Sequence, residues 1–202
     1  MKLYWFSSFN PQKVRFALAE LDLPYERQTV NLFQREHRQD WYQALAPTGQ
    51  VPVLEVDGER LWESNAILAY LGEKEARLWP GSALQKAQAL QWMFFEAYSL
   101  VQGAGPLWFY QSVGPKVGIK APEGVIQRAQ DSIRRPLRLL ESHLGERPFM
   151  MGTEFSLVDC SLATTLHALS ASEYSIEEHK AIGAYLERVR ARPGWQSCEF
   201  EY

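Results

Sequence analysis

Glu63 and Ser64 form a polar pair that can hold an anion, because they stand where the sequence predicts the start of a helix. The first N–H groups of a helix lack partners within it, and the helix dipole favours negative charge there. Just upstream, Pro52 stands at the mouth of a predicted strand, where it can hold the preceding peptide bond cis and turn the Val51 backbone outward. Residues 48–67 therefore offer a free strand edge beside an anion-receiving helix end, which suits a small peptide bound main chain to main chain.

A β-hairpin and its neighbours are predicted to position this pair. Val53, Leu54 and Val56 favour a strand, and Asp57-Gly58 is a strong signal for a two-residue hairpin turn. The order expected within the first 76 residues is β-α-β-α-β-β-α: strand 2–6, helix 11–21 with Asn10 as its N-cap, strand 25–30, helix 41–45, the hairpin, and a helix from Ser64 to about Lys74.

The rest of the chain has a helical pattern that follows a turn signal at Pro80-Gly81. We expect Gly103-Ala104-Gly105-Pro106 to interrupt the first long helix, and Pro136 to kink or break a later one. The predicted helices cover residues 83–101, 125–144, 154–169 and 177–190. The fold class is therefore α/β plus all-α, with an α/β domain over 1–76, a linker over 77–84 and an all-helical domain over 85–202.

Composition excludes several classes of protein. With 202 residues, of which 46% are hydrophobic, the chain can bury a core and is not disordered. The net charge of −3 and the absence of a basic run argue against nucleic acid as a partner. No apolar run approaches the ~20 residues that cross a bilayer, and the apolar start is too short for a signal peptide. We therefore expect no membrane association.

The cysteines predict a reducing compartment. Cys160 and Cys198 are far apart and form neither a C-x-x-C nor a zinc-binding pattern, so a cytoplasmic location without a metal site is the simple interpretation. Cys160 is expected to be buried in its helix, and Cys198, near the terminus, to be exposed.

Three motifs, in their order and spacing, resemble the cytosolic glutathione S-transferase superfamily. Residues 50–54 match its loop with a cis proline, residues 62–71 match the start of its glutathione-binding helix, and residues 155–163 match its buried capping box. The resemblance covers almost the whole chain and implies a thioredoxin-like N-terminal domain, an all-helical C-terminal domain and a homodimer. It implies an enzyme that transfers the glutathione thiolate to a small hydrophobic electrophile, with glutathione as co-substrate and no other cofactor.

The resemblance assigns parts of glutathione to individual residues. The α-carboxylate of the γ-glutamyl group would sit on the helix N-terminus and the Ser64 hydroxyl, and Glu63 would pair with its ammonium group. Val51 would exchange main-chain hydrogen bonds with the cysteinyl part. Gln50 and His37 are the expected side chains near the glycyl end. The alternatives are that Glu63 and Ser64 only cap the helix, and that His37 is a solvated loop residue.

The group that activates the thiol is left open. A thiol with a pKa of about 8.5 is mostly protonated at neutral pH, so a hydrogen-bond donor must favour the thiolate. The family uses a Tyr, Ser or Cys after the first strand. Counting back from the polar pair without gaps, Ser8 falls on the serine position of theta- and delta-like members. Asn10, Ser7 and the lack of any dedicated activator are the alternatives, while Tyr4 is expected to pack inside the strand.

Other conspicuous residues have mainly structural interpretations. Ser156 and Asp159 have the spacing of a capping box, which folds the protein and does no chemistry. The aromatic residues from Trp92 to Tyr110 are expected to be mostly core, with Phe9 and Trp108 lining an electrophile pocket. The alternative function is a non-catalytic binding or regulatory protein of the same fold.

Overall fold

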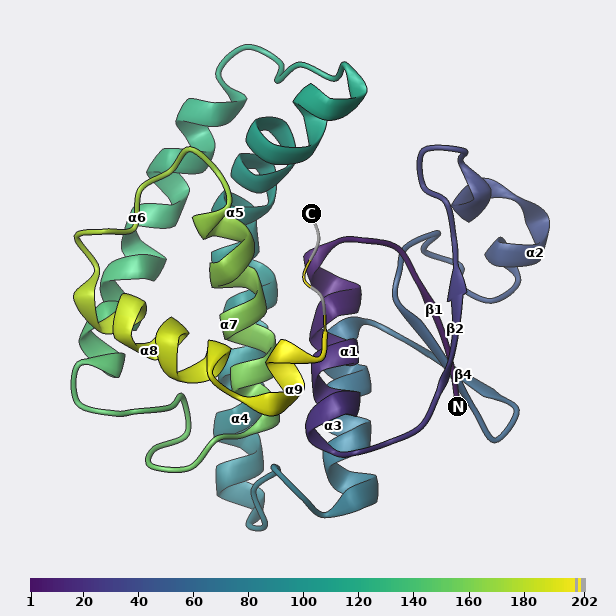
Figure 1. Cartoon of the computed structure of the whole chain (residues 1–202), viewed down its shortest axis with the longest axis horizontal. Coiled ribbons are helices and arrows are strands. Elements are labelled where there is room, and N and C mark those ends of the chain that lie inside the picture. Colours follow the sequence, from purple (N-terminus) through teal and green to yellow (C-terminus); the bar gives the residue numbers. More distant parts are fainter. Residues whose placement is uncertain (199, 201–202) are drawn as a thin grey trace.

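The computed structural model describes residues 1–198 and 200, and it places a sheet and a group of helices side by side (Figure 1). The sheet has four strands in the order β2-β1-β3-β4, with β1 parallel to β2 and antiparallel to β3. The predicted order of elements is confirmed: β1 (Lys2–Trp5), α1 (Phe9–Glu20), β2 (Glu26–Thr29), the 3₁₀ turn η1 (Glu36–Arg38), α2 (Asp40–Gln43), β3 (Val53–Val56), β4 (Glu59–Trp62) and α3 (Ser64–Glu75).

The hairpin between β3 and β4 forms as the sequence predicts. Val56 pairs with Glu59, so only Asp57 and Gly58 lie between the strands. Both have positive φ values, 53° and 82°, which are those of the turn type that follows the strand twist. Figure 1 shows α1 and α3 between the sheet and the other helices. Leu3 and Leu54 of the sheet are fully buried in the same core cluster as Leu68 of α3.

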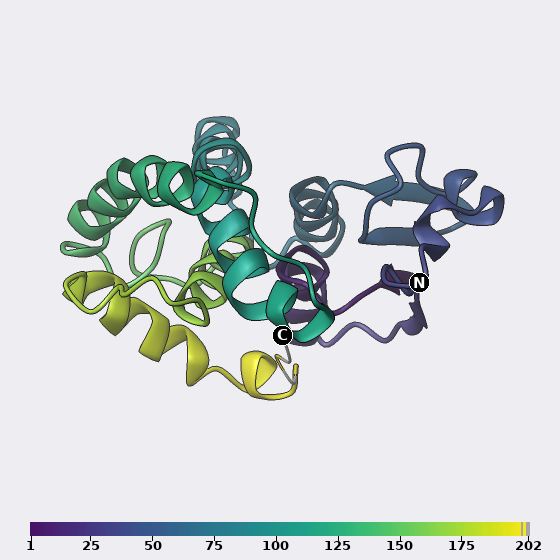
Figure 2. The ribbon, with the colours of Figure 1, turned by 90° about the horizontal axis from the view of Figure 1, so that it is seen from above.

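The helical part is arranged around one buried helix, α7. The N-terminus of α7 has the predicted capping box between Ser156 and Asp159. Figure 2 shows the remaining helices around α7 from above. Their bounds are α4 (Ala83–Phe95), the π-helix η2 (Glu96–Leu100), α5 (Val101–Trp108), the π-helix η3 (Phe109–Val113), the 3₁₀ turn η4 (Gly114–Val117), α6 (Val125–Leu144), α7 (Leu157–Ser170), α8 (Lys180–Arg190) and α9 (Pro193–Gln196).

The expected interruption at residues 103–106 was wrong. These residues lie inside α5, and helical structure runs without a gap from α4 through η2 and α5 to η3. Gly103 serves packing instead, since a Cβ there would lie 2.6 Å from the Cβ of Ile133 on α6. Pro136 likewise lies within an unbroken α6 and does not end it. Close helix contact in the folded protein outweighs the local preference of these residues to break a helix.

Two smaller expectations also need correction. The N-cap of α1 is Ser8, with φ −159° and ψ 161°, and Asn10 lies inside the first turn. Pro11 fits that turn because its missing N–H would have no partner there. Cys198 is buried, with 3% of its surface exposed, because the α9 region packs against α1. Cys160 is buried as predicted.

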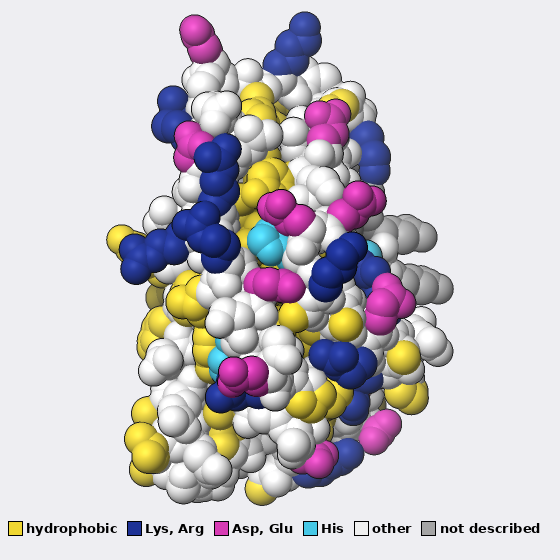
Figure 3. Space-filling model, turned by 90° about the vertical axis from the view of Figure 1, so that its left-hand side faces the viewer, with side chains coloured by type: hydrophobic (Ala, Val, Ile, Leu, Met, Phe, Trp, Pro, Cys, Tyr) yellow, Lys and Arg dark blue, Asp and Glu magenta, His cyan; other side chains and the backbone are white. Residues whose placement is uncertain are grey.

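The surface of the helical part carries charges of both signs (Figure 3). On the face that includes α6 and α8, basic and acidic side chains are interspersed (Figure 3). None of the helices within the described part of the chain is long and apolar enough to cross a membrane.

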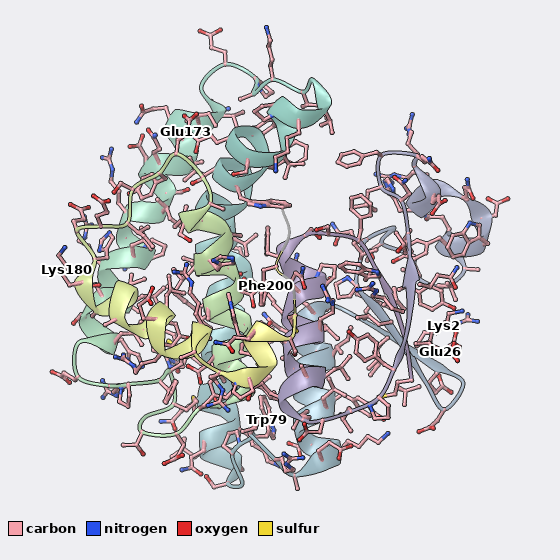
Figure 4. The ribbon with its side chains drawn as sticks, viewed as in Figure 1. Lys2, Glu26, Trp79, Glu173, Lys180 and Phe200 are labelled. Atoms are coloured by element: carbon pink, nitrogen blue, oxygen red, sulfur yellow. The ribbon has the colours of Figure 1, made fainter. Side chains whose placement is uncertain are left out.

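In Figure 4, Lys2 and Glu26 lie next to each other on paired strands, and Trp79 marks the connection from α3 to α4. A Cβ on Gly72 of α3 would lie 2.7 Å from the Trp79 side chain, so this connection packs tightly on α3.

Candidate active site

The loop before β3 presents a fixed stretch of backbone. Its Val51–Pro52 peptide bond is cis, as the sequence predicts. Gly49 has a φ of 63°, and a Cβ there would lie 2.6 Å from Nε2 of Gln43. The Tyr42 hydroxyl donates to the Gln50 carbonyl at 2.6 Å. Among the described residues, nothing pairs with the backbone N–H or C=O of Val51, so both groups are available to a ligand.

The start of α3 is the second part of the site. Glu63 is the N-cap, with φ 70° and ψ 111°, a conformation that is rare for a residue with a side chain. Ser64 is the first helical residue and is 7% exposed. The Glu63 side chain makes no capping hydrogen bond. Among the described residues, no capping bond from the pair occupies the first N–H groups of α3, which leaves these groups open to an anion.

These two parts meet in a polar cleft. Gln50, Val51, Glu63 and Ser64 line it together with Asn10 from α1. The cleft continues into a cavity of about 570 Å³ that reaches α4 and η2. Of the glutathione-binding residues predicted from the sequence, these four are brought together by the fold.

An apolar cavity of about 510 Å³ lies on the other side of the α1 N-terminus. The loops after β1 and β2 form one wall, and the end of α5 with η3 forms the other; its apolar lining includes Phe6, Leu32, Phe33, Trp108, Phe109 and Val113. Trp108 therefore lines a pocket as predicted. Phe9 is not part of this lining, and its ring packs edge-on against Trp108 at 5.3 Å between ring centroids.

The candidate thiol activators are divided between the polar cleft and the apolar cavity. Ser7 and Ser8 line the apolar cavity, whereas Asn10 lines the polar cleft. Ser8 is the N-cap of α1, yet its hydroxyl makes no capping hydrogen bond. The Asn10 Oδ1 accepts from the Lys13 ammonium at 2.8 Å. Tyr4 is buried and packs against Tyr42, as expected.

Comparison with known proteins agrees with this geometry. Residues 6–74 match the model of the glutathione S-transferase N-terminal domain, and residues 123–188 match that of the C-terminal domain. Glutathione S-transferase 3 of Zea mays is 32% identical, over 97% of this chain and 91% of its own length. The chain belongs to the glutathione S-transferase family.

Solved structures of the family have the same fold. Glutathione transferase F2 from Populus trichocarpa has a TM-score of 0.89 at 27% identity, covering 98% of this chain and 96% of its own. Apo glutathione S-transferase III has a TM-score of 0.87 at 31% identity, covering 98% and 94%. The thioredoxin-like domain and the helical domain expected from the sequence are therefore both confirmed.

His37 departs from the position expected for it. Its side chain lines the apolar cavity, and it is not among the residues that line the polar cleft with Gln50. Its carbonyl accepts from Nε2 of Gln43 at 2.6 Å, which holds the loop near Gly49. Partial burial, together with the charges of Arg38 and Arg35, lowers the pKa of His37.

A buried ion pair next to the cleft was missed from the sequence. Lys13 of α1 and Glu96 of η2 are 2.7 Å apart, with side chains 1% and 0% exposed. Glu96 also accepts hydrogen bonds from Asn65 at 3.0 Å and from Thr165 at 2.5 Å. Burial lowers the pKa of Lys13, and Glu96 opposes this effect. The only local signal for this pair was Glu96 itself, a lone acidic residue within the aromatic run. A buried charge requires a partner, so an acidic residue in a segment expected to be core indicates an ion pair.

Proposed function

We propose that this member of the family is an enzyme that binds glutathione and transfers its thiolate to a small hydrophobic electrophile. The observation that carries the proposal is that a polar cleft with unpaired backbone groups at Val51 and an apolar cavity flank the α1 N-terminus, where Asn10 lines the cleft and Ser8 lines the cavity. A glutathione transferase of Burkholderia graminis was crystallised with two glutathione molecules per subunit. It is 26% identical to this chain, with a TM-score of 0.86 over 98% of this chain and 86% of its own.

The polar cleft suits glutathione group by group. Val51 would pair with the cysteinyl backbone through its free N–H and C=O. The α-carboxylate of the γ-glutamyl group would accept from the α3 N-terminus and the Ser64 hydroxyl, and Glu63 would pair with the ammonium group. Gln50 would donate to the glycyl end.

The chemistry requires a thiolate beside the electrophile. We assign thiolate stabilisation to Ser8, because its hydroxyl caps nothing and lies at the α1 N-terminus, where positive potential favours the charged form. The sulfur electron pair then forms the new S–C bond to an electrophile held against Trp108. A leaving group, where the electrophile carries one, departs with the bonding electrons. The protein contributes mainly by holding both reactants together and by lowering the pKa of the thiol.

The proposal includes a homodimer in the cytoplasm that needs no cofactor beyond its co-substrate. Phe94 and Tyr98 are 69% and 75% exposed on α4 and η2, which is unusual for large apolar side chains and suits a surface covered by a second copy. The two buried cysteines, Cys160 and Cys198, are unpaired, which suits a reducing compartment.

The test is a calorimetric titration with glutathione followed by an assay with a generic aryl halide. We expect binding and turnover. In Ser8→Ala we expect the pKa of the bound thiol to rise and the rate to fall, and Ser7→Ala serves as the matched control. Binding without turnover would favour the non-catalytic alternative. No binding at millimolar glutathione would overturn both the site and the enzyme.

A further inference from the structure

The Lys13 ammonium is held by groups on both parts of the molecule, beside the polar cleft and in the lining of the larger cavity next to it. It donates to Glu96 at 2.7 Å and to the Asn10 Oδ1 at 2.8 Å, and it lies 5.6 Å from the centre of the Phe9 ring. Lys13 and Phe9 belong to α1, whereas Glu96 belongs to η2 in the helical part of the chain. The ion pair therefore joins the two parts of the molecule at the edge of the cleft.

Glu96 is itself held rigidly. Thr165 donates to its Oε1 at 2.5 Å, and Asn65 and Ser161 donate to its Oε2 at 3.0 Å and 3.3 Å. The side chain is fully buried. Because these three donors anchor Glu96, the Glu96 carboxylate in turn holds the Lys13 ammonium in place.

This arrangement decides how the Asn10 amide is turned. An ammonium group only donates hydrogen bonds, so the atom of Asn10 that faces Lys13 must be its oxygen. The amide nitrogen, which only donates, then points away from Lys13. Among the described residues nothing accepts from it, and Asn10 lines both the polar cleft and the larger cavity next to it. Without Lys13, the amide could turn its acceptor toward the ligand instead.

We propose that Lys13 is a positioning residue, which acts through Asn10 so that the Asn10 amide donates to the thiolate of bound glutathione from the side opposite Ser8. This inference rests on the proposed function, because it assumes that the ligand is glutathione. The Asn10 amide is then a second hydrogen-bond donor to the thiolate, besides Ser8. The buried Lys13–Glu96 pair thereby has a role beyond joining the two parts of the molecule.

The test measures the ionisation of bound glutathione by thiolate absorbance against pH. Lys13→Met alone leaves Glu96 buried without its cation, so the main variant is the double change Lys13→Met with Glu96→Gln. We expect the pKa of the bound thiol to rise by about one pH unit, which is the size expected for losing a hydrogen bond to a charged group. The affinity for S-methylglutathione, which has no ionisable thiol, should stay the same. The matched control is Arg192→Met with Glu20→Gln, an ion pair between α1 and the C-terminal region that lies outside the cleft.

A double-mutant cycle with Asn10→Ala separates positioning from a general effect. In the Asn10→Ala background, neutralising Lys13 and Glu96 should no longer change the pKa of the bound thiol. Equal shifts in both backgrounds, or an equal loss of affinity for glutathione and S-methylglutathione, would overturn the inference. If the unchanged protein ionises bound glutathione while the double variant shows no shift, only this inference fails. If the unchanged protein does not bind glutathione, the proposed function fails as well.

Discussion

The helices α3 and α7 begin in opposite ways. At the start of α7, the buried Asp159 carboxylate accepts from the backbone N–H groups of Ser156 and Met150, each at 2.8 Å, and from the Tyr185 hydroxyl at 3.1 Å. At the start of α3, the side chain of the N-cap Glu63 makes no capping hydrogen bond within the described residues, and Glu63 has a positive φ. One helix end has its polar groups satisfied within the protein, whereas the other leaves them open to a cavity.

This difference separates folding from binding. A satisfied helix end stabilises the fold and has no free donor for a ligand. An open end gives up that stabilisation and retains backbone donors whose natural partner is an anion. A strained N-cap such as Glu63 persists only where the surrounding structure holds it, which is typical of functional sites. The predictions below test this contrast, beginning with the largest expected effect.

Asp159→Ala should lower the free energy of unfolding by about 4 kcal/mol, because two buried N–H groups and the Tyr185 hydroxyl lose their acceptor. Turnover per folded molecule should stay nearly unchanged. Urea unfolding and an assay normalised to the folded fraction measure the two effects. Normal stability with selectively lost turnover would contradict the contrast.

The stability of the protein should depend on pH because the Asp159 carboxyl group titrates differently in the folded and unfolded states. Burial raises the pKa of Asp159 from 3.8 to about 6, against the opposing hydrogen bonds. The folded state therefore binds this proton more tightly than the unfolded state. This contribution is most favourable below about pH 4, falls by about 3 kcal/mol as the pH rises to 6, and is constant above. Unfolding measured from pH 4 to 7 checks it, and Asp159→Asn should show a flatter profile; an identical slope in that variant would rule out the assignment.

Ser64→Ala tests the open helix end. Glutathione affinity should fall about tenfold, since a hydrogen bond from the hydroxyl to a carboxylate is lost. Stability should change by less than about 0.5 kcal/mol, because the hydroxyl supports no capping hydrogen bond. Calorimetric titration and urea unfolding measure the pair of effects. A large loss of stability with unchanged affinity would reverse the interpretation of this helix end.

Ser82→Ala provides an exposed third case. The Ser82 hydroxyl accepts from the Gln85 N–H at 3.2 Å and caps α4 in the ordinary way. We expect a loss of about 1 kcal/mol in stability and no change in glutathione affinity. Weaker binding in this variant would show that helix capping affects the cleft indirectly. It would then contradict the separation of capped helix ends from the ligand-binding end of α3.

Features set by neighbouring residues were predictable. The hairpin at Asp57-Gly58, the cis bond before Pro52 and the capping box of Ser156 and Asp159 each depend on a few adjacent residues, and all three occur in the structure. The failures concern packing between distant segments. The helix through residues 103–106 is held by contact with α6, and Cys198 is covered by the packing of the C-terminal region.

The candidate site also has a part set by neighbouring residues and a part set by packing between distant segments. Gln50, Val51, Glu63 and Ser64 lie within one short stretch whose motifs could be recognised, and they do share a cleft. The sequence predicted His37 beside Gln50 and both Phe9 and Trp108 in the pocket lining. The cavity that His37 lines, and the absence of Phe9 from the lining that contains Trp108, depended on how the loops and α5 approach each other.

The sequence by itself determined the order of strands and helices in the first domain, and the backbone features of residues 48–67 on which the proposed glutathione site rests. Local hydrogen bonding and steric limits act over a few residues, so short sequence motifs are enough to predict the turns and caps that they produce. Only the tertiary structure decided that an apolar cavity lies across the α1 N-terminus from this edge, and that Lys13 and Glu96, 83 residues apart, form a buried pair beside the cleft. Such pairs depend on which faces of distant helices meet, and no local pattern encodes that meeting.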